Sequence, residues 1–353
     1  MNEGWTTNTT PAELAAWLRD QRAVVILTHT KPDGDALGSS LALARAINRV
    51  RATSGAASVA ECWYAGPMPP WAPALMGETK CRVIEPGQPV PGALDPSAVV
   101  VTDTGAWQQL DAFAEWLRPR AADTAIIDHH LSGDADVGER KLLDTAAAAV
   151  VQPVALVCLE LLGLESPTEL PTDIAEALYT GLATDTGWFR HSNIDRRVMH
   201  LAGDLLETGV NHGRLFELIE QQDRTSRLRL LRRALDSLEI VPEKRFAMMS
   251  LTKADFDEAG AAPGDSGGFV DIARSVRDIR VTAVLTEAEP NAPEGPVTKI
   301  SMRSKSEPYE GDEPVDVAAV CRTLGGGGHA RAAGARLRMP LAEAKAKLLE
   351  ALG

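Results

Sequence analysis

Acidic and histidine residues gather in short clusters, and three of these clusters directly follow an apolar run typical of a buried strand. The carboxyl ends of parallel strands open on one crevice, so side chains from these clusters should converge there. A single Asp-Gly-Asp turn would be ordinary turn chemistry, but the coincidence of ligand-type residues at three strand ends indicates a functional site. The clusters are His29, Asp33 and Asp35; Asp103; and Asp128, His129 and His130, with Asp185 following a helical pattern.

The four aspartates outside the Asp128 cluster would place four negative charges in this crevice. Two carboxylates about 5 Å apart repel by roughly 3 kcal/mol at an effective dielectric of about 20, so the group needs compensating cations. Two divalent ions would supply that charge, and His29 and His129 would add nitrogen ligands. A mixed His and Asp shell without sulfur suits Mn²⁺, Zn²⁺ or Fe²⁺. Two such ions can stabilise the attacking and leaving oxygens of a phosphoryl displacement.

A second candidate site lies in a run of four glycines, Gly325 to Gly328, placed between a helix-like run and a strand-like run. Consecutive glycines adopt positive φ and let backbone N–H groups approach an anion closely. His329 follows as a hydrogen-bond donor, and Arg303 offers a planar guanidinium that suits a phosphate. Because linkers seldom sit inside so small a domain, the run predicts an anion-binding turn.

The elements that must position the first site alternate between apolar runs and helical patterns, as in a parallel α/β sheet. Thr10 and Glu13 form a capping box that predicts the start of a first helix. An amphipathic helix is expected over 36–50, whereas the Pro- and Gly-rich segment 68–95 is expected to be irregular. The predicted strands of the first half are residues 23–28, 58–63, 98–102 and 124–127.

The second half begins with a helical pattern from about residue 145 to 237, after which strand-like runs resume. A polar insertion at 307–314 should form a surface loop. A chain of 353 residues is long enough for two domains. The expected fold is a parallel-sheet α/β domain with flanking helices over residues 1–210, a helical connector over 211–237 and a smaller α/β domain over 238–353.

Composition limits the classes of partner. The formal charge of −13 argues against binding of long nucleic acid, whose affinity comes mainly from Lys and Arg on phosphates. Four separated cysteines without a C-x-x-C pair fit a reducing cytoplasm. The most apolar helical stretch, 146–164, is interrupted by Gln152, Pro153 and Glu160, so it predicts a buried helix and no membrane partner. The sequence leaves a homodimer open.

The order and spacing of the motifs resemble those of the DHH phosphoesterase family. The glycine run together with Arg303 resembles the smaller domain associated with that family, and the length is most similar to the branch of bifunctional oligoribonucleases and PAP phosphatases (nanoRNases). The four motifs of the first domain are His29-x-x-x-Asp33-x-Asp35-x-x-Gly38-Ser39, Val101-Thr102-Asp103-Thr104, Asp128-His129-His130 and Asp185-Thr186-Gly187.

The resemblance also implies a role for each residue. Two divalent cations, Mn²⁺ or alternatively Mg²⁺, would be bound, with Asp103 bridging them. His130 would contact the scissile phosphate or assist the leaving group, and Asp128 would orient it. The remaining ligands would be His29 and Asp33 for one ion, and Asp35, His129 and Asp185 for the other. The substrate-binding residues would be Arg190, Arg303, Gly326, Gly327, Gly328 and His329.

The activity implied is hydrolysis of short oligoribonucleotides to mononucleotides and of adenosine 3′,5′-bisphosphate (pAp) to AMP and phosphate. One alternative is a phosphodiesterase for cyclic or linear dinucleotides such as c-di-AMP and pApA. Another is a catalytically idle nucleotide-binding regulator, which the filled ligand positions disfavour. The chain departs from relatives at Gln108 and Gln109, where an Arg is common, and at Gln152, where a Glu is common; these departures bear on substrate preference.

Overall fold

The computed structural model describes residues 4–53, 60–84, 88, 90, 95–289, 292–293, 295–305 and 314–353. They form two compact units, Met1–Gln222 and Asp223–Gly353, and each is described by itself. The division falls inside the segment 211–237, for which the sequence indicates a helical connector. Helix α8 (His212–Glu220) occupies this segment in the first unit and helix α9 (Thr225–Asp236) in the second.

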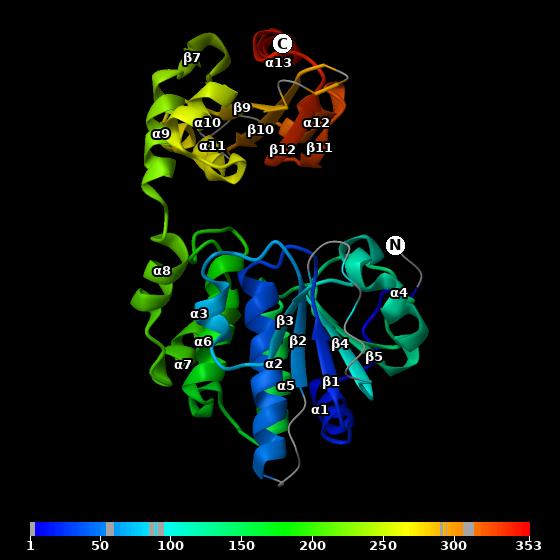
Figure 1. Cartoon of the computed structure of the whole chain (residues 1–353). Helices are drawn as coiled ribbons and strands as arrows, with labels where there is room; N and C mark the ends of the chain where they lie inside the picture. The colour runs from blue at the N-terminus through cyan, green and yellow to red at the C-terminus, as the bar shows by residue number, and fades with distance from the viewer. Residues whose placement is uncertain are drawn as a thin grey trace. The chain divides into compact units, whose positions relative to one another are not determined.

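A six-stranded parallel sheet forms the centre of the first unit (Figure 1). Its order is β3-β2-β1-β4-β5-β6. Strands β1 to β3 extend the sheet in one direction and β4 to β6 in the other, so the strand order reverses between the neighbours β1 and β4. Side chains of β1 alternate between two cores, and every one of them is buried, as expected for a strand covered on both faces. The strands are β1 (Val24–Leu27), β2 (Ala60–Ala65), β3 (Cys81–Ile84), β4 (Ala98–Thr102), β5 (Thr124–Asp128) and β6 (Arg140–Leu143).

Helices α1, α2, α5 and α6 cover one face of this sheet, and the short helix α4 with its flanking 3-10 turns covers the other. Helix α2 is buried on nearly all sides, which corrects the amphipathic helix expected over 36–50. Its small residues allow close packing, because a Cβ on Gly38 would lie 2.3 Å from the Ala177 carbonyl oxygen of α6. The helices are α1 (Pro11–Arg19), α2 (Gly34–Thr53), α3 (Ala72–Met76), α4 (Ala114–Leu117), α5 (Val151–Leu162), α6 (Thr172–Asp185) and α7 (Arg196–Glu207).

Most predicted elements of the first unit form where expected, including the capping box of α1. The segment 68–95 was wrongly expected to be irregular, since it contains α3 and β3. Edge strand β3 has only one fully buried residue, so it lacks the apolar run that marks an inner strand. The start of the second expected strand, at Ser58, lies outside the described residues.

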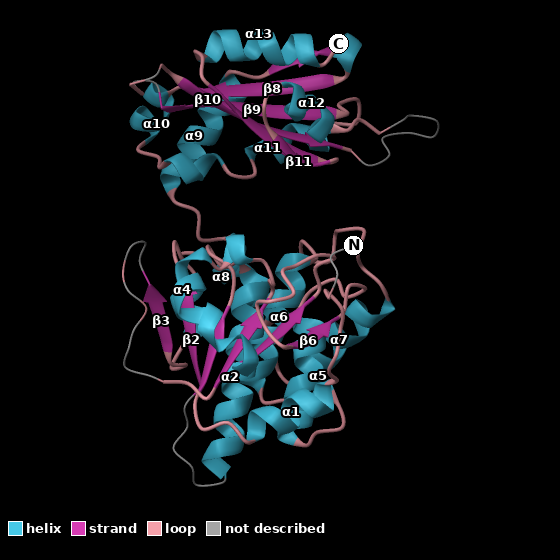
Figure 2. Ribbon diagram, turned by 90° about the vertical axis from the view of Figure 1, so that its right-hand side faces the viewer, coloured by secondary structure: helices cyan, strands magenta, loops and turns pink. Residues whose placement is uncertain are grey.

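The second unit is a mixed sheet in the order β11-β12-β10-β9-β8-β7, with helices on both faces (Figure 2). Helices α12 and α13 pack on one face, and α9, α10 and α11 on the other. The expected loop at 307–314 lies outside the described residues except for Pro314. The elements are β7 (Glu239–Val241), β8 (Phe246–Leu251), α10 (Lys253–Ala259), α11 (Phe269–Ile272), β9 (Val281–Glu289), β10 (Val297–Ser304), α12 (Val317–Thr323), β11 (Gly327–His329), β12 (Ala332–Leu337) and α13 (Leu341–Ala351).

Among the described residues, no helix has both the length and the apolar composition required to cross a membrane.

Candidate metal centre

The Asp and His clusters of the first unit meet at the carboxyl ends of its strands. His29 follows β1 and Asp103 follows β4, so the two residues face each other where the strand order reverses. In open α/β sheets this is where ligands bind. The clusters line a cavity of about 290 Å³. Its Asp and His lining consists of His29, Asp33, Asp103, Asp128, His129, His130 and Asp185.

Asp103 lies at the centre of this group, and its two carboxylate oxygens face different partners. Oδ2 lies 3.4 Å from Nε2 of His29, and Oδ1 lies 3.5 Å from Nε2 of His129. The side chain is buried, and its backbone has φ of 63°, a left-handed conformation that Asp tolerates better than most residues. Such strain is typical of functional sites, and here it directs one carboxylate at two clusters.

The two histidines are held so that Nε2 points into the cluster. Nδ1 of His29 lies 3.0 Å from the Thr30 carbonyl oxygen, and Nδ1 of His129 lies 3.1 Å from the carbonyl oxygen of Ala147. A carbonyl can only accept, so each Nδ1 carries the proton and donates it. Each Nε2 is therefore the nitrogen available to a cation, an arrangement common among metal-ligating histidines.

The carboxylates give this cluster a strongly negative potential. Burial alone would lower the pKa of His29, but interactions with Asp103 and Asp33 raise it to about 10. Burial likewise opposes protonation of His129, yet Asp103 and Asp35 raise its pKa to about 10. Burial, followed by repulsion from Asp103 and Asp33, raises the pKa of Asp185 to about 6. In the absence of metal ions, protons bound to these side chains offset part of the negative charge of the cluster.

Backbone N–H groups fix the two aspartates at the start of α2. The Oδ1 atom of Asp33 accepts from the N–H groups of Asp35 and Ala36, at 3.0 and 3.1 Å, and so caps the helix. Asp35 is almost fully buried and accepts from the N–H groups of Val150 and Val151 at 2.5 and 3.2 Å. Burial and the charges of Asp103 and Asp185 raise the pKa of Asp35 well above its ordinary value.

His130 differs from the other two histidines because its partner is a buried carboxylate. Oδ1 of Asp128 accepts from Nδ1 of His130 at 2.7 Å and from the backbone N–H groups of His129 and His130. This contact raises the pKa of His130. Oδ2 of Asp128 is buried and has no hydrogen-bond partner among the described residues. Asp128 thus orients His130, whose side chain is about half exposed and offers Nε2 to a ligand.

The donor set fits divalent cations. Ligand atoms of three groups lie within 4.8 Å of one another: His29, Asp33 and Asp103; Asp35, His129 and Asp185; and Asp103, His129 and His130. Oxygen and imidazole donors without sulfur suit Mn²⁺, Mg²⁺ or Zn²⁺. The four cysteines are free, and none lines this cavity. Cations here would replace protons on the histidines and relieve the repulsion around Asp35.

The predicted substrate residues are not among those that line this cavity. Arg190 is exposed on the turn after α6, where Nε donates to the Gly187 carbonyl oxygen at 2.8 Å. Arg303 lines a cavity of about 550 Å³ in the second unit, together with the glycine run. Residues Gly327–His329 of that run form edge strand β11, and a Cβ on Gly326 would lie 2.1 Å from the Gly334 carbonyl oxygen. The second half of the run is therefore part of an edge strand that pairs with β12.

Sequence reasoning missed groups that support the cluster without being ligands. The backbone of residues 147–151 binds both Asp35 and His129, but backbone groups leave no signal in residue type. Gln152 fixes that segment, because its Oε1 accepts from the Ala148 N–H at 2.7 Å. Trp5 donates from Nε1 to the His130 carbonyl oxygen at 3.2 Å. Trp5 and His130 are 125 positions apart along the chain, so no local sequence pattern indicates this contact.

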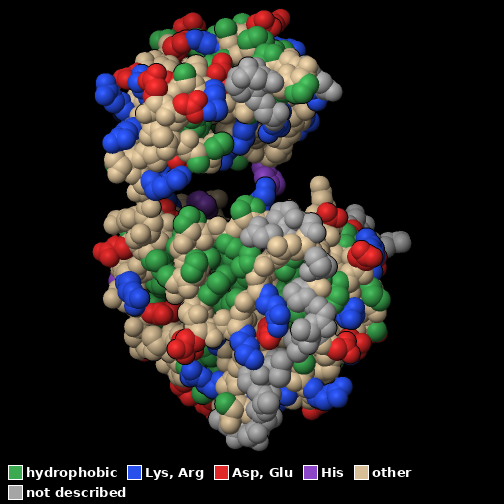
Figure 3. All heavy atoms as spheres, viewed as in Figure 1, with side chains coloured by type: hydrophobic (Ala, Val, Ile, Leu, Met, Phe, Trp, Pro, Cys, Tyr) green, Lys and Arg blue, Asp and Glu red, His purple; other side chains and the backbone are tan. Residues whose placement is uncertain are grey.

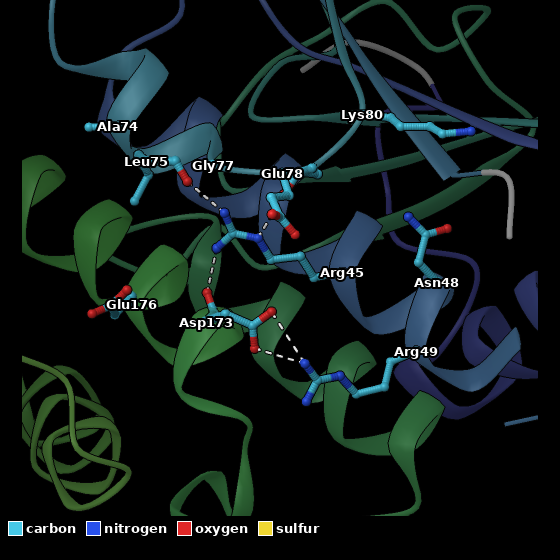
Figure 4. A pocket seen from close by; sticks show the side chains of 11 residues that line it. Arg45, Asn48, Arg49, Ala74, Leu75, Gly77, Glu78, Lys80, Asp173 and Glu176 are labelled. Carbon is cyan, nitrogen blue, oxygen red and sulfur yellow. Dashed lines mark hydrogen bonds and ion pairs between the residues drawn. The ribbon is translucent and has the colours of Figure 1, made fainter. Parts of the chain in front are cut away.

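A larger cavity of about 740 Å³ lies elsewhere in the first unit, between α2, α3 and the start of α6 (Figure 4). Arg45 donates to the carbonyl oxygens of Leu75 and Asp173, and Arg49 pairs with the Asp173 carboxylate at 3.1 Å. These contacts tie α3 and α6 to α2. Arg45, Arg49 and Asp173 thus serve the packing of these helices, and the clustered Asp and His residues do not line this cavity.

Known proteins share this sequence pattern and fold. Residues 23–182 match the DHH family, N-terminal domain, and residues 244–353 match the DHHA1 domain. The bifunctional oligoribonuclease and PAP phosphatase NrnA of Thermus thermophilus is 31% identical over 330 residues, 93% of this chain and 89% of that protein. The protein of the same name from Bacillus subtilis is 25% identical over 68% of this chain and 69% of its own length. The structure of an exopolyphosphatase-related protein from Bacteroides fragilis, at 22% identity, superposes with a TM-score of 0.80 and covers 97% of this chain and 95% of that one.

Proposed function

The chain belongs to the DHH family of phosphoesterases, and on that premise we propose that it hydrolyses short oligoribonucleotides to mononucleotides and pAp to AMP and phosphate. The relatives named as oligoribonuclease and PAP phosphatase support this substrate class. The observation that carries the proposal is Asp103, whose two oxygens face two separate groups of His and Asp side chains. One carboxylate placed in this way suits a pair of cations.

We infer that the site holds two divalent ions, with Mn²⁺ as the first candidate and Mg²⁺ as the second. When bound, such a pair supplies positive charge for both the attacking and the leaving oxygen of a phosphoryl displacement. His29 and Asp33 would hold one ion, and Asp35, His129 and Asp185 the other, with Asp103 shared. The backbone contacts of Asp33 and Asp35 keep both carboxylates in place whether or not an ion is bound.

The chain's own proton donor is His130. Asp128 fixes its Nδ1–H and favours the protonated ring, so Nε2–H is directed to the open side of the cavity. From there it can donate to a non-bridging phosphate oxygen or to the leaving oxygen. A positioned acid of this kind contributes about 10²–10⁴ in rate. Asp128 acts through His130, as its buried carboxylate does not reach solvent.

The proposed limit on substrate size rests on the net charge of the chain. Basic and acidic side chains are interspersed on the face of the first unit that Figure 3 shows, and the chain carries a net charge of −13. Long nucleic acid binds through many phosphate contacts at once, so short substrates are favoured. We propose Arg190, Arg303, Gly326, Gly327, Gly328 and His329 as the substrate-binding residues and, from the four free cysteines, the cytoplasm as the compartment.

A substrate panel with Mn²⁺ tests the proposal. Wild-type protein and the Asp103→Asn variant, purified in parallel, are assayed on pAp, on RNA of two to about thirty nucleotides, on c-di-AMP and on pyrophosphate. We expect the wild-type protein to turn over pAp and the shortest RNAs and to lose this activity when chelator is added. The Asp103→Asn variant should turn over none of the substrates. Faster hydrolysis of c-di-AMP than of pApA and pAp would replace the proposal by the cyclic dinucleotide phosphodiesterase. Absence of turnover on every substrate would leave a binding regulator.

A further inference from the structure

The segment before α1 reaches the candidate metal centre, although it lies outside the span matched by the DHH family, which begins at residue 23. Its anchor is the free edge of β6. The Asn8 N–H donates to the Lys141 carbonyl oxygen at 2.9 Å, and Oδ1 of Asn8 accepts from the Lys141 N–H at 2.7 Å. Thr7 adds contacts to Lys141 and Leu143. We call residues 4–8 the N-terminal strap.

The strap places the indole of Trp5 against two loops of the site. The ring is almost fully buried in the core below the sheet, and Nε1 donates to the His130 carbonyl oxygen. A Cβ on Gly105 would lie 1.9 Å from the ring, and a Cβ on Gly133 would lie 2.4 Å from it. Both glycines have ordinary backbone angles, so the ring is the reason that no side chain fits there.

Those two loops carry the central groups of the cluster. The loop after β4 contains Asp103 and Gly105, and the loop after β5 contains His130 and Gly133. They are also tied to each other, because the Asp134 N–H donates to the Gly105 carbonyl oxygen at 2.7 Å. The indole therefore contacts both loops within three residues of Asp103 and His130, while Asp128 holds only the His130 ring and the start of its loop.

We propose that Trp5 is a positioning residue that sets the place of His130 relative to Asp103. This rests on the proposed function of the same site. A positioning role for the ring explains why a large aromatic side chain from the N-terminal strap fills the space beneath two glycines. Without it, the loop after β5 would keep the Asp128 contact and the Asp134 hydrogen bond but lose the packing of the ring against its backbone beyond His130.

A double-mutant cycle tests this role in the metal-loaded full-length enzyme. Trp5→Ala should lower kcat about 10- to 100-fold, change KM less than about 3-fold and leave the metal content unaltered. In a His130→Ala background the same substitution should change kcat less than about 2-fold, because its effect passes through His130. Loss by the same factor in both backgrounds would overturn the proposal.

A matched control and a conservative variant separate positioning from packing. Trp116 belongs to the same side of the sheet, packs on Trp63 with ring centroids 5.1 Å apart, and does not line the site. Trp116→Ala should therefore leave kcat within about 2-fold of wild type; a drop equal to that of Trp5→Ala would overturn the proposal. Should Trp5→Ala fail to fold, Trp5→Phe, which loses only the donor and part of the ring, should lower kcat about 2- to 5-fold and have no effect without His130.

Hydrogen exchange supplies a readout that does not depend on activity. In Trp5→Ala the amide of Asp134 should exchange at least about 10-fold faster than in wild type, while the amides of β1 should exchange at the wild-type rate. In Trp116→Ala the exchange rate of the Asp134 amide should also equal that of wild type. Unaltered exchange at Asp134 would show that the indole does not hold the loops. A wild-type enzyme without phosphoesterase activity would instead overturn the proposed function, and the exchange result would still decide the place of Trp5.

Discussion

Binding of metal ions should release protons from the two histidines of the cluster. The carboxylates raise the pKa of His29 and of His129 to about 10. At pH 7 each ring is therefore neutral in only about one molecule in a thousand. A metal ligand must be neutral imidazole. Loading both ions at pH 7 should thus release about two protons from the histidines, a lower bound for the whole cluster, and displacing each requires about 4 kcal/mol of the binding free energy, three pH units at 1.36 kcal/mol each.

Isothermal titration calorimetry of metal-free protein with Mn²⁺, in three buffers of different ionisation enthalpy, measures this number directly. The product of the two affinities should rise about 100-fold per pH unit between pH 7 and 9. His29→Gln should release about one proton fewer, whereas replacement of the exposed His200 should leave the count unchanged. Release of fewer than one proton at pH 7 would refute the idea that the carboxylates hold both histidines protonated.

The same shifts fix the sign of a stability change. A histidine whose pKa is raised in the folded state contributes stability that is complete below its unfolded pKa of about 6.5 and is lost as pH rises through about 10. Asp185, with a folded pKa of about 6, contributes in the same direction, between about pH 4 and 6. Metal-free protein should therefore become less stable from pH 7 to 10, and urea denaturation with and without Mn²⁺ should show a difference that widens over this range.

Four substitutions extend the test. Asp103→Asn keeps a residue type that tolerates positive φ, so it should fold and lose both ions by elemental analysis; retention of two ions would contradict a shared ligand. His130→Ala should keep two ions and lose about 10²–10⁴ in kcat, and loss of one ion would make it a ligand. Gly38→Ala should lower the free energy of unfolding by about 1–3 kcal/mol in urea, since its Cβ meets the backbone of α6; an unchanged midpoint would show that the helices separate freely. Arg303→Ala should lower kcat/KM for dinucleotides by about 1.5–3 kcal/mol but hardly affect bis-p-nitrophenyl phosphate, and equal losses on both would exclude a role in substrate binding.

The ligand-type residues could be named from the sequence because their identities and their positions at strand ends are both local properties. The runs before His29, Asp103 and Asp128 are apolar and short, and the parallel order of the strands follows from the alternating pattern. The parallel sheet confirms the predicted fold class, and the match to the DHH family confirms the predicted resemblance. The domain limits and the role of each site residue stay predictions.

Other features depend on contacts that no local pattern records. The burial of most of α2 accompanies its approach to α6 at Gly38, whereas Ser, Arg and Asn along the helix suggested an exposed face. Strand β3 forms through pairing with β2, although its own residues are half exposed. The N–H groups of Val150 and Val151 that bind Asp35 belong to apolar residues, whose side chains point to packing alone.

The N-terminal strap also bears on how the protein behaves in solution. Strand β6 is the outer strand of its sheet, and the strap occupies the N–H groups of Lys141 and Leu143 and the carbonyl oxygens of Glu139 and Lys141 along its open side. An uncovered strand edge is a template for pairing with another chain. A shortened protein that starts at the family-matched residue 23 would lack both the strap and α1. It would present this edge and part of its core to its neighbours, so aggregation during expression is the expected outcome.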